Sequence, residues 1–161
     1  MRKYFLFIFL TCSLACTPGY KLPRGESSLE NLASKVTSEI TQGDKSSYLQ
    51  LAVHKNEFIH DVFSNLKISK DGLVGDMVWA WLIVNQKSGF LTLQGKYKDF
   101  EFVSVGKPKK TKLELNQLKT LSNIPITLRS KVSGKEVTDD KILGNVFYDG
   151  EKYLLWTHSY E

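Results

Sequence analysis

Histidines and carboxylates are the side chains of this 161-residue sequence best suited to acid-base or metal chemistry. His54, Glu57 and Asp61 are spaced so that a helix would place them on one face, where an imidazole and two carboxylates can transfer protons or bind a metal. The solvent face of an ordinary amphipathic helix has the same pattern. His60 would lie on a different side of a helix from His54, which argues against a pair of histidine ligands.

The third histidine, His158, alternates with Trp156 near the C-terminus. If the strands of this region enclose a cavity, Trp79, Phe147, Trp156 and His158 are predicted to line it as aromatic walls with one titratable group. Ordinary core packing is the alternative for these side chains. A second alternative is an exposed aromatic patch for a partner protein, made of Tyr148, Tyr153, Trp156 and Tyr160.

Familiar catalytic and cofactor signatures are missing from the sequence. There is no G-x-S-x-G, P-loop, G-x-G-x-x-G, H-E-x-x-H or EF-hand loop. We therefore predict no catalytic residues, no metal and no cofactor, and favour a non-enzymatic binding or interaction domain. The alternative is a small hydrolase or isomerase that uses His54 or His158 with Asp61 or Asp76.

Cys12 and Cys16 are the only cysteines of the chain. They follow Arg2, Lys3 and the apolar stretch 4–15, which is shorter than the roughly 20 residues that span a bilayer. This order is typical of a secretory signal, predicted over residues 1–15, and Cys12 would be removed with it. With no other cysteine, a disulfide-stapled fold and a cysteine-based zinc site are excluded.

"SLAC", residues 13–16, resembles the lipobox of bacterial lipoproteins, although Ser13 stands where Leu is commonest and Leu14 stands one place later. The resemblance implies diacylglyceryl transfer to the Cys16 thiol, cleavage after Ala15 and acylation of the new amino group. Two or three acyl chains anchor a protein stably, so the expected partner is membrane lipid and the expected location is the bacterial cell envelope. A secreted protein with an unmodified Cys16 is the alternative.

Electrostatics give little further indication of a partner. The formal net charge is +5, and Arg2 and Lys3 carry two of these charges, so the remaining chain keeps about +3. Nucleic acid is therefore not expected as a partner. The densest basic run, residues 107–112, has no interleaved aromatic residue and is predicted to be a solvated turn between strands, with contact to anionic headgroups as the alternative.

Residues 16–27 are rich in Pro, Gly and polar residues, which predicts a flexible tether. Residues 28–161 are expected to form a single domain. Ser27 and Glu30 have the spacing of a capping box, so the first helix is predicted from about Ser28 to Gln42, closed by Gly43.

Further helices are predicted after Asp44, which can act as an N-cap, and over residues 58–66, where apolar side chains form one stripe. Residues 77–84 are apolar on every side, and a buried strand is an alternative to a helix there. We favour a helix with Asp76 as its N-cap and Gly95 near its end. Its expected inner side consists of Trp79, Leu82, Ile83, Phe90, Leu93 and Tyr97.

The period changes to two after residue 99, and Asp149-Gly150 is a hairpin signal that places Val146 with Leu155 and Phe147 with Leu154. Both faces of this hairpin are apolar, so helices and a partner must cover them, or the sheet must curve around a cavity. We predict an α+β fold with N-terminal helices packed on a curved C-terminal antiparallel sheet. The element order over residues 28–161 resembles the NTF2-like and cystatin-like cone folds, which host enzymes, binding modules and scaffolds alike. The expected binding of a protein partner or a small apolar ligand rests instead on the lipobox, the aromatic-rich sheet with two apolar faces and the missing catalytic motifs.

Overall fold

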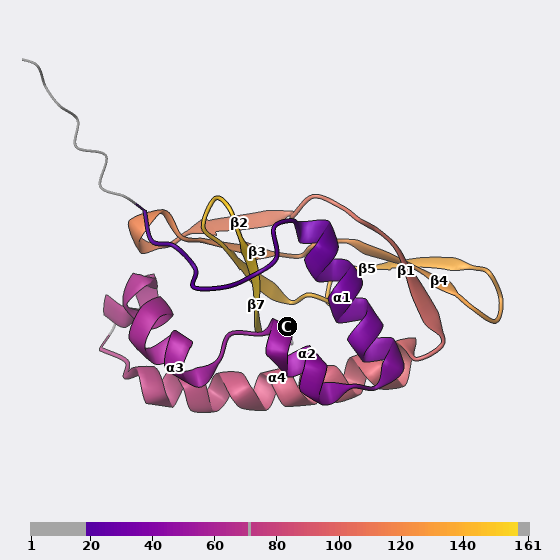
Figure 1. The fold of residues 1–161 in the computed structure, drawn as a ribbon, viewed down its shortest axis with the longest axis horizontal. Coiled ribbons are helices and arrows are strands. Elements are labelled where there is room, and N and C mark those ends of the chain that lie inside the picture. The colour runs from indigo at the N-terminus through magenta and orange to yellow at the C-terminus, as the bar shows by residue number, and fades with distance from the viewer. Residues whose placement is uncertain (1–18, 71, 158–161) are drawn as a thin grey trace, which may run out of the picture.

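Helices precede strands along the chain, and together they form an α+β fold (Figure 1). This computed structural model describes residues 19–70 and 72–157, so the predictions for Cys12, Cys16, His158 and Tyr160 lie outside the described residues. The α-helices are α1 (Leu29–Gln42), α2 (Lys45–Leu51), α3 (Lys55–Glu57) and α4 (Gly75–Tyr97). The strands are β1 (Phe100–Val105), β2 (Lys110–Leu113), β3 (Lys119–Ser122), β4 (Ile126–Ser130), β5 (Glu136–Asp139), β6 (Asn145–Tyr148) and β7 (Tyr153–Thr157).

The strands of the described chain divide into two antiparallel sheets, a detail that the sequence did not predict. One sheet has the order β1-β4-β5 and the other has the order β2-β3-β6-β7. In the β6–β7 hairpin, Val146 lies opposite Leu155 and Phe147 lies opposite Leu154, so the predicted hairpin and its register are confirmed. The strand β2 is an edge strand with every residue exposed, although residues 107–112 were predicted to be a turn. Lysines on an edge strand hinder pairing with another sheet.

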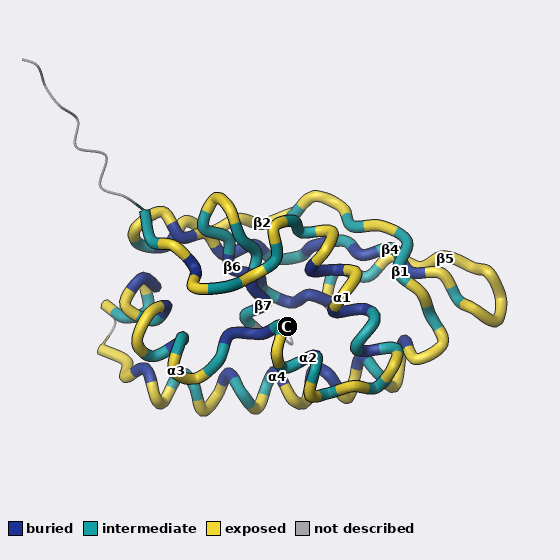
Figure 2. The backbone as a smooth tube through the Cα atoms, in the orientation of Figure 1, coloured by how far each residue is buried: buried dark blue, intermediate teal, exposed yellow. Residues whose placement is uncertain are grey.

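Two hydrophobic cores lie on opposite faces of the β6–β7 hairpin. Val146 and Leu155 belong to the first core, with side chains of α1, α2 and the C-terminal half of α4. Phe147 and Leu154 belong to the second core, with Leu22 and side chains from the first half of α4 and from the irregular helical turns between α3 and α4. Figure 2 shows the buried stretches on the inner sides of these elements. The chain itself therefore covers both apolar faces of the hairpin.

The first two helices are capped by side chains of their preceding residues. Ser28 is the N-cap of α1, because its Oγ accepts a hydrogen bond from the backbone N–H of Asn31 at 3.1 Å. The predicted cap at Ser27 is therefore wrong by one residue. Gly43 ends α1 with φ 75°, a left-handed conformation that glycine adopts without strain, and Asp44 caps α2 as predicted.

The region between α2 and α4 is helical but irregular. The three-residue α3 continues into a π-helical turn η1 (Phe58–Val62), followed by the 3-10 turns η2 (Phe63–Asn65) and η3 (Lys67–Lys70). The single apolar stripe predicted for residues 58–66 is thus spread over a π-helical turn and a 3-10 turn. Phe58, Val62 and Leu66 nevertheless all point into the second core.

Residues 77–84 are helical, as favoured from the sequence, within the long helix α4. Its N-cap is Val74 rather than Asp76, which lies in the first turn and pairs through its carboxylate with Lys55 Nζ at 3.0 Å. Gly95 lies near the end of the helix, which is Tyr97, as the sequence predicted. Of the predicted inner side, Leu82, Phe90, Leu93 and Tyr97 are buried, and Trp79 and Ile83 are half-buried.

Candidate functional site

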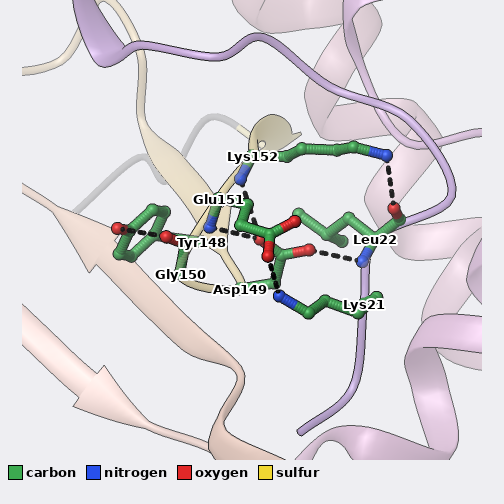
Figure 3. Close-up of polar contacts among 7 residues, drawn as sticks. All are labelled: Lys21, Leu22, Tyr148, Asp149, Gly150, Glu151 and Lys152. Atoms are coloured by element: carbon green, nitrogen blue, oxygen red, sulfur yellow. Dashed lines mark hydrogen bonds and ion pairs between the residues drawn. The ribbon is translucent and has the colours of Figure 1, made fainter.

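Residues 19–27, predicted to belong to a flexible tether, pack against the domain. The Leu22 side chain is 1% exposed in the second core, and its backbone N–H donates to Asp149 Oδ2 at 2.7 Å (Figure 3). Lys21 Nζ lies 2.5 Å from Glu151 Oε1, and Lys152 Nζ donates to the Leu22 carbonyl at 3.1 Å. The assignment of all of residues 16–27 to a tether is therefore wrong for its described part.

Tyr20 is the first residue of this segment held by the domain. Its backbone N–H donates to the Asn116 carbonyl at 2.8 Å, in the connection between β2 and β3. Burial raises the pKa of Tyr20 to about 12, and the carboxylates of Asp61 and Asp149 act in the same direction. The phenol is therefore neutral throughout the physiological pH range.

Arg24 joins the same segment to the connection between α2 and α3. Its Nε donates to Glu57 Oε1 at 2.6 Å, and its other nitrogens donate to the carbonyls of Gln50, at 2.5 Å, and Ala52. Burial raises the pKa of Glu57, but the hydrogen bonds from Arg24 and from the His54 backbone N–H outweigh it and lower the pKa. The Glu57 carboxylate is thus ionised and accepts hydrogen bonds that hold the fold together.

The predicted acid-base cluster at residues 54–61 is consequently not assembled around Glu57. His60 and Asp61 are exposed on η1, and Asp76 pairs with Lys55. Within residues 19–70 and 72–157, no group of three or more His, Cys, Asp or Glu side chains could hold a metal ion. The contacts of Glu57 and Asp76 are therefore those of carboxylates that stabilise the fold.

Three of the four residues predicted to line a ligand pocket lie in one aromatic cluster of the second core. Phe147 is fully buried and stacks on Trp156 with a centroid distance of 4.6 Å, while Trp79 packs on Phe58 at 5.8 Å. His158 lies outside the described residues. The rings thus form two contacting pairs within the same hydrophobic core, which is an arrangement of core packing.

The aromatic patch considered as an alternative is divided by the sheet. Tyr148 and Tyr153 stack at 4.4 Å and pack against the first core, whereas Trp156 belongs to the second core. These three side chains therefore do not form one surface.

A polar cleft of about 640 Å³ lies beside Trp156, on the side of the sheet toward β2. Its lining is mostly lysine, hydroxyl and amide side chains: Lys109, Lys110, Thr111, Lys112, Glu114, Thr120, Ser122, Asn145 and Trp156. The Nε1 of Trp156 is buried without a hydrogen-bond partner in the described part of the chain. The rim is basic, but Lys109 already pairs with Asp140 at 3.0 Å.

Glu114 is a buried carboxylate in this cleft that the sequence did not single out. Its Oε2 accepts from the backbone N–H of Lys67 at 2.9 Å, and its Oε1 lies 2.8 Å from Lys112 Nζ. Thr120 Oγ1 donates to the same Oε1 at 3.4 Å. The cation and the two donors compensate the buried charge, so Glu114 holds η3 to the β2–β3 hairpin.

The outer face of α4 is the largest group of exposed apolar side chains on a helix of the described chain. Val74, Met77, Trp81, Val84 and Leu91 are each 57% to 65% exposed. In Figure 1, α4 runs along one edge of the molecule with no other described segment outside it, and Figure 2 shows its exposed stretches on that outer side. A contiguous exposed apolar surface of this kind typically marks an interaction site. The apolar character of 77–84 on every side was the sequence signal for it.

Comparison with protein-family models, with curated proteins and with solved structures gives no significant match. In the portion of the chain that the structure describes, no helix is both long enough and apolar enough to cross a membrane.

Proposed function

We propose that this protein is a bacterial lipoprotein, anchored in a membrane of the cell envelope by acyl chains on Cys16, whose folded domain binds a protein partner. The SLAC sequence at residues 13–16 supports the anchor. The exposed apolar face of α4 supports the interaction role, because a group of exposed apolar side chains along one helix face often marks an interaction site.

The charge arrangement of the domain supports binding over catalysis. Two of the predicted acid-base carboxylates are paired: Glu57 with Arg24, and Asp76 with Lys55. The buried Glu114 is likewise compensated by Lys112. For Glu57, burial raises the pKa, but the hydrogen bonds from Arg24 and from the His54 backbone N–H outweigh it and lower the pKa, so this carboxylate is a weak proton acceptor at neutral pH.

The anchor is tested by intact mass and by partitioning into a detergent phase, with wild type beside Cys16→Ser expressed in a bacterial host. We expect the wild type alone to gain the mass of acyl chains and to enter the detergent phase, because only a thiol at position 16 accepts the diacylglyceryl group. Two cleaved, aqueous proteins with no added mass would refute the lipoprotein proposal.

A further inference from the structure

The outer face of α4 has the spacing of a helix-pairing seam. Val74, Met77, Trp81, Val84 and Leu91 follow one another at intervals of three and four residues, with Ser88 completing the series between Val84 and Leu91. Apolar residues at alternating intervals of three and four are the pattern by which one helix packs along another. The occupant of this face is therefore expected to be a helix.

The seam is also complementary to itself when a second α4 runs antiparallel across it with Val84 at the two-fold axis. In that register, Trp81 lies opposite Ser88 and Met77 lies opposite Leu91. Val74 lies opposite Gly95, where a Cβ would find nothing within 4 Å. The bulkiest side chain, Trp81, thus meets a serine and Val74 meets a glycine, which allows close approach at these two positions of an isologous interface.

Polar groups along the seam are compatible with burial. Ser88 Oγ donates to the Val84 carbonyl at 2.9 Å, and Thr92 Oγ1 donates to the Ser88 carbonyl at 3.1 Å, so both hydroxyls are satisfied within their own helix. Lys87 flanks the seam, and the antiparallel register places it opposite Ala80 of the second copy. Burying this face therefore leaves no unpaired hydroxyl and brings no like charges together.

The area agrees with a dimer. From their exposed fractions, the five large apolar side chains of the seam offer on the order of 600 Å², close to the roughly 800 Å² that each partner contributes to a standard interface. We propose that this protein self-associates as an antiparallel two-fold dimer through the outer face of α4. The inference deepens the interaction role proposed above and is independent of the lipid anchor.

Sedimentation equilibrium on the Cys16→Ser chain tests the dimer without any contribution from acyl chains. We expect the Cys16→Ser protein to be a dimer at tens of micromolar, and the additional substitution Val84→Lys to make it a monomer with an unchanged circular dichroism spectrum, because two ammonium groups would meet at the axis. Val132→Lys is the matched control, since Val132 is an exposed valine in the connection between β4 and β5, outside the seam, and this variant should stay dimeric.

Three outcomes would overturn the proposal. The first is a monomeric Cys16→Ser protein, and the second is a dimer that Val84→Lys leaves intact. In the third, the Cys16→Ser protein sediments with neutral phosphatidylcholine vesicles and the additional substitution Val84→Lys abolishes this binding. That result would mean that the outer face of α4 binds lipid. Each of these results leaves the acyl-mass test of Cys16 unaffected, so failure of the dimer and failure of the anchor are distinguishable.

The orientation has its own test in the Cys16→Ser background. With an antiparallel seam, a mixture of Met77→Cys and Leu91→Cys chains should oxidise to a cross-linked pair at least tenfold faster than either chain alone. A parallel pair would instead cross-link Leu91→Cys with itself, which would contradict the proposed register.

Discussion

The helices α1 and α4 are the two longest of the described chain and both pack on the first core, but their outer faces differ in kind. The inner face of α1 is apolar, as at Leu32 and Ile40, and its outer face is polar, as at Glu30 and Lys35. The helix α4 has an apolar inner face around Phe90 and an equally apolar outer face around Trp81. The outer face of α1 is polar and is well solvated by water. The outer face of α4 is apolar, so its burial against a second surface would be favourable.

Shortening side chains on the two faces of α4 should have very different effects on stability, and this is the most direct test of the contrast between a buried and an exposed apolar face. Phe90→Ala removes a fully buried ring and should lower the free energy of unfolding by about 3 to 5 kcal/mol. Trp81→Ala, on the outer face, should change it by less than about 0.5 kcal/mol. Urea unfolding at a low protein concentration, where the chain is monomeric, measures both. Equal losses would mean that the outer face is buried within the monomer.

The comparison also requires that residues 19–27 be held elsewhere, because a free segment of that length could cover α4. Leu22→Ala should destabilise the domain by about 2 to 5 kcal/mol, since Leu22 is part of the second core. Lys21→Ala is the control in the same segment and should change the stability little, because its ion pair with Glu151 is exposed. The urea midpoints of the two variants are compared. Equal midpoints for Leu22→Ala and Lys21→Ala would support the flexible tether predicted from the sequence.

A pH dependence should accompany the docking of this segment. Burial raises the pKa of Asp149, but the backbone N–H groups of Lys152, Leu22 and Glu151 stabilise the carboxylate more strongly, so its pKa is lowered. The pKa of Glu57 is also lowered, because the hydrogen bond from Arg24 and the other donors outweigh the effect of burial. The ordinary pKa values are 3.8 for Asp149 and 4.5 for Glu57. Because folding lowers both pKa values, the two carboxylates stabilise the folded state when the pH is above these ordinary values, and this stabilisation is lost as the pH falls below them.

Urea midpoints measured from pH 7 to pH 3 test this dependence. The wild type should lose stability on acidification below about pH 5. The Asp149→Asn, Glu57→Gln double variant should start lower at pH 7 and fall less. Parallel curves for the two proteins would show that these carboxylates do not hold the segment.

The smallest expected effect concerns the start of α1. Ser28→Ala should cost about 1 kcal/mol, because it removes the hydroxyl oxygen that accepts the Asn31 N–H. Ser27→Ala, one residue earlier, should be close to neutral. Thermal unfolding of the pair decides which serine caps the helix, and the reverse order would support the capping box predicted from the sequence.

Local patterns were sufficient for much of the fold. The apolar spacing predicted α1 and α4, and the Asp149-Gly150 turn predicted the pairing of Val146 with Leu155, because each depends on residues close in sequence. The helix limits at Ser28 and Val74 were missed by one or two residues, since competing side chains stand next to each true cap.

The docking of residues 19–27 could not be predicted in the same way. Their Pro and Gly content describes backbone freedom, whereas the burial of Leu22 depends on a surface that Leu118, Phe147 and Leu154 form only after folding. Similarly, Glu114 and Lys67 meet across a large separation in sequence. For α4, the sequence predicted the inner side, as at Leu82 and Phe90, but only the structure shows that the opposite apolar side is left exposed.

The contact between Tyr20 and Asn116 limits how far an anchored domain can move. Four peptide units separate Cys16 from Tyr20, a reach of at most about 14 Å when fully extended. A lipidated chain would therefore confine its α4 seam to a thin layer beside the bilayer, where neighbouring copies meet at a high effective concentration. A dimer that is weak in dilute solution would then be the prevailing form at the membrane, and its extent would vary with the surface density of the protein.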